Sequence, residues 1–217
     1  MTANINLQRR RFIKTSLGAM GGLMLGVYFT NASAENTSMA GPGLAGEAGA
    51  KAGLFEPNAF VRITPDNSVT VIIKHLEMGQ GSHTGLATLV AEELDADWSQ
   101  IRTEGAPADP SKYNNLAFGP MQGTGGSTSM ANSFQQMRKA GAAARAMLVA
   151  AAAERWQVPA AEITVKAGML NHPSGNKATF GELAEAAAKQ PVPADVTLKT
   201  PEQFIYIGKN NLRRVDA

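Results

Sequence analysis

The chain has 217 residues, a length that suits one domain with at most a short additional piece. It contains no cysteine, which excludes disulfides and cysteine-ligated zinc or iron–sulfur clusters in this polypeptide. Residues 1–34 hold four of the 20 basic residues and none of the 18 acidic ones, so the remainder carries a formal net charge of −2 and lacks the basic character of a nucleic-acid-binding protein.

The N-terminal 34 residues have the organisation of an export signal. Basic residues at positions 9–11 and 14 precede an apolar stretch at 17–29, and Ala32-Ser33-Ala34 forms a small-x-small cleavage pattern. The apolar stretch is shorter than the ~20 residues that a spanning helix needs. Arg9-Arg10 resembles a twin-arginine signal, whose route carries folded proteins and often serves proteins that receive a cofactor before export. The sequence therefore predicts a signal peptide at 1–34 and a periplasmic protein.

The first half of the remaining chain predicts strands followed by a helix. Residues 35–54 are small, polar and glycine-rich and indicate a flexible linker. Apolar and β-branched residues within 59–76 predict two strands joined by a turn at 65–68. Leucine and valine at helical spacing predict a helix within 86–97, and a further strand is expected within 99–107.

The second half contains the strongest helical pattern. Apolar and small residues recur at helical spacing from Met130 to Trp156, and Gly141 would let another backbone pack closely against this helix. Residues 161–180 predict a hairpin, and Thr179 with Glu182 predicts a capping box for a short helix at 180–190. These patterns predict an α+β fold in which two main helices pack on a small, mostly antiparallel sheet. We expect the domain to cover 55–190 and to be followed by a linker at 191–217.

A glycine-rich loop stands between the predicted strands and the first helix. Gly79-x-Gly81 is not a dinucleotide fingerprint, because Thr84 replaces the third glycine, and no Gly-Lys-Ser/Thr follows that would make it a P-loop. Such a loop can direct backbone N–H groups and the Gln80 amide at a ligand beside a helix N-terminus. The alternative is a plain strand-to-helix turn.

A second glycine-rich loop precedes the long helix. In residues 123–133, Gly125-Gly126 permits close backbone approach, while Ser127, Thr128 and Ser129 offer hydroxyl groups and possible helix caps. This loop predicts either a second cradle for an anion or pterin, or an ordinary capped helix start.

Taken together, the two loops resemble a known family. The segments EMGQGSHTGLATLVAEELDADWSQIRTEGAPADP (77–110), QGTGGSTSM (122–130) and RKAGAAARAMLVAAAAERW (138–156) are similar to the molybdenum hydroxylases. Within that family they resemble the large subunit of the isoquinoline 1-oxidoreductase and periplasmic aldehyde dehydrogenase branch. The resemblance extends over about residues 57–216.

The resemblance implies a molybdenum–molybdopterin cofactor, in bacteria usually the cytosine dinucleotide form. Residues Met78, Gly79, Gln80 and Gly81 would then run beside the dithiolene and the molybdenum oxo group, to which Gln80 would donate a hydrogen bond. The segment that would hold the pterin and its phosphates consists of Gly126, Ser127, Thr128 and Ser129. The metal would be held by pterin sulfurs, so the lack of cysteine raises no conflict.

The resemblance also implies an oxidoreductase subunit with partners. An intact enzyme of this kind hydroxylates an aldehyde or an N-heteroaromatic compound with oxygen from water and passes electrons to a small iron–sulfur subunit and onward to a cytochrome subunit. Family subunits continue for several hundred residues and carry a catalytic glutamate that this sequence lacks. We therefore expect no catalytic residue here, and either the remainder of the large subunit acts in trans or the chain is a truncated, non-catalytic module.

For the other polar residues the sequence indicates structural rather than catalytic or metal-binding roles. His75, His83 and His172 lack metal-ligand spacing, and His83 is expected to hydrogen-bond locally. Adjacent Glu92 and Glu93 would point in different directions on a helix and so form no acid–base pair. The basic cluster of the long helix is expected on a solvated face, or alternatively against a phosphate or partner domain; it consists of Arg138, Lys139 and Arg145.

Overall fold

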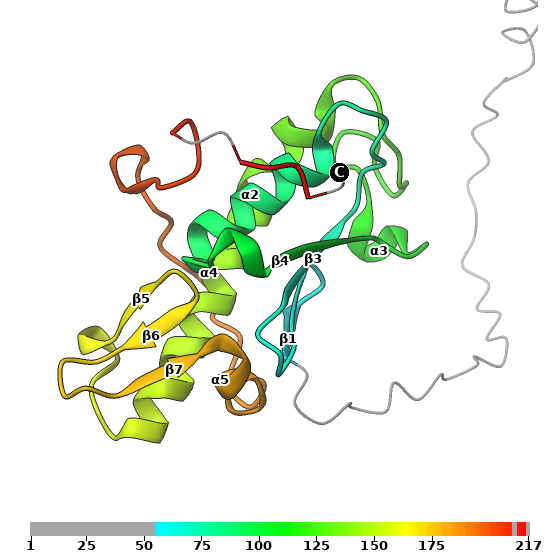
Figure 1. Cartoon of the computed structure of the whole chain (residues 1–217). Coiled ribbons are helices and arrows are strands. Elements are labelled where there is room, and N and C mark those ends of the chain that lie inside the picture. The colour runs from blue at the N-terminus through cyan, green and yellow to red at the C-terminus, as the bar shows by residue number, and fades with distance from the viewer. Residues whose placement is uncertain (1–54, 210–211, 216–217) are drawn as a thin grey trace, which may run out of the picture. The chain divides into compact units, whose positions relative to one another are not determined.

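The computed structural model describes residues 55–209 and 212–215 (Figure 1). The predicted signal peptide at 1–34 and the predicted linker at 35–54 lie outside these ranges. Among the described residues, no helix combines the length and apolar character that crossing a membrane requires.

The first sheet has four strands in the order β1-β2-β3-β4. Their bounds are Phe55–Asn58, Val61–Ile63, Val69–Ile73 and Ile101–Gly105. The pairs β1–β2 and β2–β3 are antiparallel, whereas β3 and β4 run parallel and are connected through a helix. Val69 and Val71 are fully buried, as expected for the strand at the centre of the sheet.

Two helices pack against each other and against this sheet. They are α2 (Ser82–Leu94) and α4 (Thr128–Trp156), and Figure 1 shows them side by side. They lie close together at Gly141, where an added Cβ would lie 2.6 Å from the carbonyl oxygen of Val90. The predicted close approach of another backbone at Gly141 is therefore confirmed. Both helices begin earlier than predicted, directly after their glycine-rich loops.

The distal part of α4 carries a second, smaller unit of structure. Its strands are β5 (Thr164–Lys166), β6 (Met169–Asn171) and β7 (Lys177–Thr179), paired antiparallel in the order β5-β6-β7. Helix α5 (Phe180–Ala187) follows, packs on α4, and begins with the predicted Thr179–Glu182 capping box.

The α+β class, the two main helices and the mostly antiparallel pairing are thus confirmed. The strands divide between two sheets, however, and the predicted hairpin at 161–180 is a three-stranded meander. The turn between β5 and β6 consists of only Ala167 and Gly168, both at positive φ. Because this turn and the two strands are so short, the sequence pattern predicted β5 and β6 as a single strand.

The remaining helical elements of the described residues are short. They are η1 (Trp98–Gln100), α3 (Pro110–Tyr113), η2 (Ala160–Glu162) and η3 (Pro201–Gln203). The last of these belongs to residues 199–207, which we call the strap because they lie along α2 and α4.

Two adjacent buried carboxylates of α2 hold the strap. Glu92 accepts the backbone N–H groups of Ile205, Tyr206 and Ile207 at 2.8–3.1 Å. Glu93 accepts the N–H of Lys199 at 3.1 Å. Part of the segment predicted as a linker, 191–217, therefore packs on the helices.

Glu93 also forms an ion pair with the long helix. Its carboxylate lies 2.6 Å from a guanidinium nitrogen of Arg138, and both side chains are buried. The solvated face predicted for the basic cluster is therefore wrong at Arg138, because its charge is paired inside the protein. Lys139, one residue later and on another face of α4, is exposed as predicted.

Candidate functional site

The two glycine-rich loops meet at the N-terminal ends of the two main helices. The backbone N–H of Leu76 donates to the hydroxyl of Thr124 at 2.8 Å, and Nδ1 of His75 lies 3.2 Å from the carbonyl oxygen of Gly123. A cavity of about 290 Å³ lies beside this contact, at the ends of β3 and β4, and none of the eight predicted cofactor-binding residues lines it. Its lining includes Lys74, His75, Leu76, His83, Gln122, Gly123 and Thr124. Residues nearly 50 positions apart are thus brought to one place.

The first loop, residues 76–81, is organised around the carboxylate of Glu77. Its Oε1 accepts the N–H groups of Gly79 and Gly81 at 2.8 and 2.9 Å, and its Oε2 accepts the N–H of His83 at 3.0 Å. A carboxylate in this position satisfies otherwise unpaired N–H groups and is favoured by the helix dipole of α2. The carboxylate of Glu77 thus occupies the position at the start of α2 that would otherwise favour a bound anion.

The side chain of Gln80 is also engaged within the first loop. Its amide nitrogen donates to the carbonyl oxygen of Leu76 at 2.7 Å, and its oxygen accepts the N–H of Met78 at 2.6 Å. Met78 itself is 70% exposed. Gly79 and Gly81 adopt φ values of 98° and 85°, and an added Cβ at either would meet no atom within 4 Å. The positive φ values therefore favour glycine at both positions, and the backbone there is open to contact by other groups.

The second loop leads into a helix whose N-terminus is open. Gly126 and Ser127 adopt φ values of 60° and 56°. Ser127 is the N-cap residue of α4 but makes no side-chain capping bond, and the first turn contains no acidic residue. Thr128 turns back and donates its hydroxyl to the carbonyl oxygen of Gly125 at 2.7 Å. The N–H groups and dipole of this 29-residue helix therefore favour an anion there.

A buried polar network fixes the second loop, and sequence reasoning missed it. The fully buried Asn115 donates to the carbonyl oxygen of Gly123 at 3.0 Å and to the hydroxyl of Thr128 at 2.9 Å. Its side-chain oxygen accepts from Asn132. Asn115 lies in a segment without periodicity, so no sequence signal distinguished it from any other loop asparagine.

His75 connects this network to the first sheet. Its Nε2 lies 3.1 Å from the hydroxyl of Ser133 on α4, and the side chain is 1% exposed. Burial and the neighbouring charge of Lys74 lower the pKa of His75, which favours the neutral ring that this hydrogen bonding uses. His83 contacts the first loop through its backbone N–H, and none of the described residues forms a cluster of His, Asp or Glu that would hold a metal ion.

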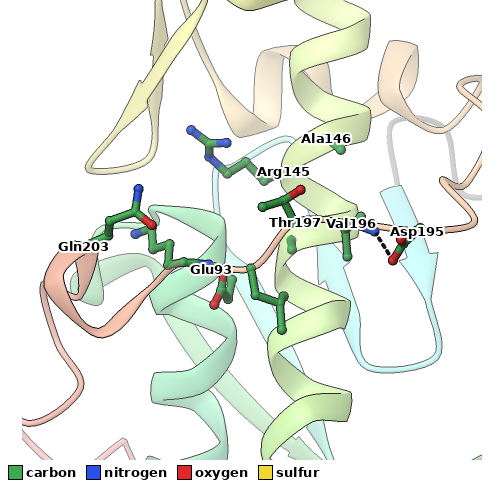
Figure 2. A pocket seen from close by; sticks show the side chains of 10 residues that line it. Glu93, Arg145, Ala146, Asp195, Val196, Thr197 and Gln203 are labelled. Carbon is green, nitrogen blue, oxygen red and sulfur yellow. Dashed lines mark hydrogen bonds between the residues drawn. The ribbon is translucent and has the colours of Figure 1, made fainter.

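A larger cavity lies elsewhere, beneath the residues that precede and begin the strap (Figure 2). It has a volume of about 460 Å³ and lies between α4 and residues 195–203. Two of the cations that line it, Arg145 and Lys199, are paired with carboxylates of α2 and its C-cap. Arg145 approaches Asp95 at 2.9 Å, and Lys199 contacts both Glu92 and Asp95. None of the sequence-predicted site residues lines this cavity.

Comparison with known proteins places the chain in a family. The sequence matches the molybdopterin cofactor-binding domain family over residues 21–211. The chain belongs to this family. The predicted resemblance to the molybdenum hydroxylases is thereby confirmed.

Two curated relatives cover nearly the whole chain. Isoquinoline 1-oxidoreductase subunit beta from Brevundimonas diminuta is 38% identical over 95% of this chain and 24% of its own length. A membrane-bound aldehyde dehydrogenase from Gluconacetobacter polyoxogenes, named as pyrroloquinoline-quinone dependent, is 32% identical over 97% of this chain and 26% of its own length. The chain thus spans about a quarter of the length of both relatives.

A solved structure is also similar. Quinoline 2-oxidoreductase from Pseudomonas putida 86 aligns with 64% of this chain and 17% of its own, with 22% identity and a TM-score of 0.45.

Proposed function

We propose that this domain is the cofactor-binding portion of a molybdopterin-dependent oxidoreductase subunit that hydroxylates an aldehyde or an N-heteroaromatic compound with oxygen from water. The observation that carries the proposal is the meeting of the two glycine-rich loops at the N-termini of α2 and α4. These loops and the first turn of α4 contain all eight residues predicted to contact the cofactor. The names of the relatives supply the two substrate classes.

The second loop fits the phosphate-bearing part of such a cofactor. The open N-terminus of α4, the absence of an acidic residue in its first turn, and the left-handed backbone at Gly126 and Ser127 suit an anion. Gly126, Ser127, Thr128 and Ser129 would hold the pterin and its phosphates, with the cytosine dinucleotide form as the proposed cofactor.

The first loop would have a different role, beside the part of the cofactor that carries the metal. Because Glu77 already occupies the N–H groups at the start of α2, this loop would contribute backbone surface and the Gln80 amide rather than an anion cradle. Met78, Gly79, Gln80 and Gly81 would lie beside the dithiolene. To hydrogen-bond an oxo ligand, the Gln80 amide nitrogen would exchange its bond to Leu76 for one to the cofactor.

The bound cofactor would supply the redox chemistry, and this chain would orient it. We further propose that electrons leave through a separate iron–sulfur subunit, with a cytochrome subunit beyond it, because the chain has no cysteine to ligate a cluster. The remainder of a large subunit would supply the substrate cavity and the catalytic base. The Arg9-Arg10 pattern supports export to the periplasm by the twin-arginine route.

A second candidate is a non-catalytic module that has lost cofactor binding. The observation that favours it is the first loop, in which the side chains of Glu77 and Gln80 hydrogen-bond to backbone groups of the loop itself. The two candidates differ in whether the chain retains molybdenum.

The test is the molybdenum content of the tagged chain recovered from its own host together with its co-purifying partners. We expect about one molybdenum per chain, as for a stoichiometric cofactor. The double variant Ser127→Ala/Ser129→Ala should lower this content severalfold, whereas Ser174→Ala, in the turn between β6 and β7, should not. Absence of molybdenum from the wild-type preparation would overturn the proposal and support the non-catalytic module.

A further inference from the structure

Residues 212–215, the last that the structure describes, lie along the start of α2. The indole N–H of Trp98 donates to the carbonyl oxygen of Arg213 at 3.1 Å. Val215 packs against the hydrophobic core and donates its N–H to the hydroxyl of Thr84, in the first turn of α2, at 3.2 Å. Figure 1 shows this red segment alongside α2. The residue between these two attachments, Arg214, is therefore held in a defined place.

That place is beside the carboxylate of Glu77. The Nη2 atom of Arg214 lies 3.5 Å from Oε1 of Glu77. The same oxygen accepts the N–H groups of Gly79 and Gly81. The Glu77 side chain is 14% exposed and that of Arg214 is 43% exposed, so the pair is partly shielded but still within reach of dissolved ions. A cation from a distant part of the sequence thus faces the group that organises the first loop.

The charge of Glu77 matters for the proposed function. The dithiolene and the phosphates of a molybdopterin cofactor are anionic, and Glu77 directly precedes the residues proposed to lie beside the dithiolene. A carboxylate there would repel the cofactor unless its charge were offset, because like charges a few ångströms apart interact unfavourably. The guanidinium of Arg214 offsets this charge and also attracts the carboxylate on the side of its backbone N–H partners.

We propose that Arg214 is a positioning residue for the first loop. It acts through Glu77, whose charge it offsets and whose carboxylate it keeps on the N–H groups of the loop, so that residues 78–81 retain the conformation that would face the cofactor. This inference rests on the proposed function and adds a residue outside both loops on which retention of the cofactor would depend.

Salt tests the ion pair in the unmodified protein, because dissolved ions screen a partly exposed charge pair. The full chain is purified from cells grown without molybdate, so that no cofactor protects the loop. Between about 0.05 M and about 0.5 M sodium chloride, we expect hydrogen exchange at the amides of Gly79 and Gly81 to accelerate about threefold. The amide of His172, which donates to the neutral carbonyl of Asn176 at 3.0 Å, is the internal control and should not change.

Three variants separate the charge of Arg214 from its bulk. Arg214→Ala should exchange about threefold faster at the loop amides at low salt and should lose the salt dependence. Arg214→Lys should restore both, because the contact depends on charge rather than on the fork of the guanidinium. Arg213→Ala is the matched control, since this neighbouring side chain is exposed and the residue contributes its backbone carbonyl. Thermal unfolding verifies that all three variants fold.

The molybdenum content of the same variants, recovered from the native host, tests the link to the cofactor. We expect Arg214→Ala to contain about threefold less molybdenum than the wild type, as for the loss of one partly exposed ion pair. Arg214→Lys and Arg213→Ala should contain about as much as the wild type.

Unchanged exchange in Arg214→Ala, or equal acceleration in Arg213→Ala, would overturn the positioning role. An Arg214→Lys variant that behaves like Arg214→Ala would overturn the role of charge. A wild-type preparation without molybdenum would count against the proposed cofactor function, while the exchange data would still decide whether Arg214 positions the loop. A loaded wild type together with an equally loaded Arg214→Ala would overturn the link between this residue and the cofactor.

Discussion

The carboxylate of Glu92 on α2 accepts the backbone N–H of Tyr206 at 2.8 Å, which joins a fully buried acidic group to a segment 114 residues later in the chain. The same carboxylate also accepts from Ile205 and Ile207 and contacts the ammonium group of Lys199. A single side chain thereby replaces the hydrogen bonds that regular secondary structure would otherwise give the strap.

Acid should weaken this attachment. Burial favours the neutral form of Glu92, but the N–H groups of the strap and the charge of Lys199 outweigh it and hold the pKa of the carboxyl below its ordinary value. A carboxyl group with a lowered folded-state pKa stabilises the protein above its unfolded-state pKa of about 4.3, and this contribution is lost as the pH falls through the folded-state value.

We expect Glu92→Gln to lower the free energy of unfolding at pH 7 by about 2–4 kcal/mol, because it leaves Lys199 and several N–H groups without the charged acceptor. The variant should also lose less stability than the wild type as the pH falls below about 4.5. Urea denaturation across pH 3–7 measures both effects. Glu185→Gln, on the exposed side of α5, is the control, and equal acid sensitivity in all three proteins would contradict the prediction.

Arg138 should be essential to the packing of α4 against the strap. It forms a buried ion pair with Glu93, donates to the carbonyl oxygen of Lys199, and lies 5.2 and 5.1 Å from the ring centroids of Phe134 and Phe204. Arg138→Ala would leave the Glu93 carboxylate buried without its cation, and we expect a loss of about 3–5 kcal/mol in the free energy of unfolding.

Lys139→Ala provides the matched control for Arg138, because this neighbouring cation is exposed. It should change the free energy of unfolding by no more than about 0.5 kcal/mol. Chemical denaturation of both variants gives the comparison. If the two substitutions had similar effects, the buried pair would not contribute as the structure indicates.

The packing of α2 against α4 depends on Gly141. An alanine Cβ would lie 2.6 Å from a backbone oxygen of Val90, so the two helices would have to move apart. Alanine raises helix propensity by about 1 kcal/mol, but we expect overpacking to prevail and to give a net loss of about 1–2 kcal/mol. Gly105→Ala, where an added Cβ meets no atom within 4 Å, is the control. A Gly141→Ala variant as stable as the wild type would show that the helices separate freely.

Glu77 should control the conformation of the first loop. Glu77→Ala removes the acceptor for the N–H groups of Gly79, Gly81 and His83, and we expect a loss of about 1–3 kcal/mol in the free energy of unfolding. Hydrogen exchange at these three amides should accelerate by about tenfold, because their protection reports local opening. Glu104→Ala, on an exposed strand position, is the control. Unchanged exchange at the three amides would show that another group holds the loop.

Local pattern predicted much of this fold, because periodicity depends on near neighbours in the sequence. Leu86, Leu89, Val90 and Leu94 are all buried as their spacing indicates, and Gly141 lies at the predicted close approach. The capping box at Thr179 and Glu182 is likewise a local arrangement. The division into two sheets depends instead on which strands meet in space, and spacing alone does not determine that.

The long-range polar contacts could not be predicted in this way. Glu92, Glu93 and Arg138 appear in the sequence as ordinary surface charges of helices, and their partners lie up to 115 positions away. Asn115 resembles any loop asparagine until the fold brings Gly123 and Thr128 to it. The role of Glu77 could have been predicted from the sequence, because the helix dipole favours an acidic residue just before a helix start.

The attachment of the strap also has a consequence during synthesis. Glu92 and Glu93 emerge from the ribosome more than 100 residues before Lys199 and Tyr206, which supply their partners. Until those residues are available, the carboxylate of Glu92 lacks the strap groups that satisfy it, and that of Glu93 has Arg138 but not the N–H of Lys199. Domains generally fold as units as the chain is made. The packing of α2 into its final position should therefore be completed late, and a nascent chain that ends before the strap should be a preferred target of chaperones and proteases.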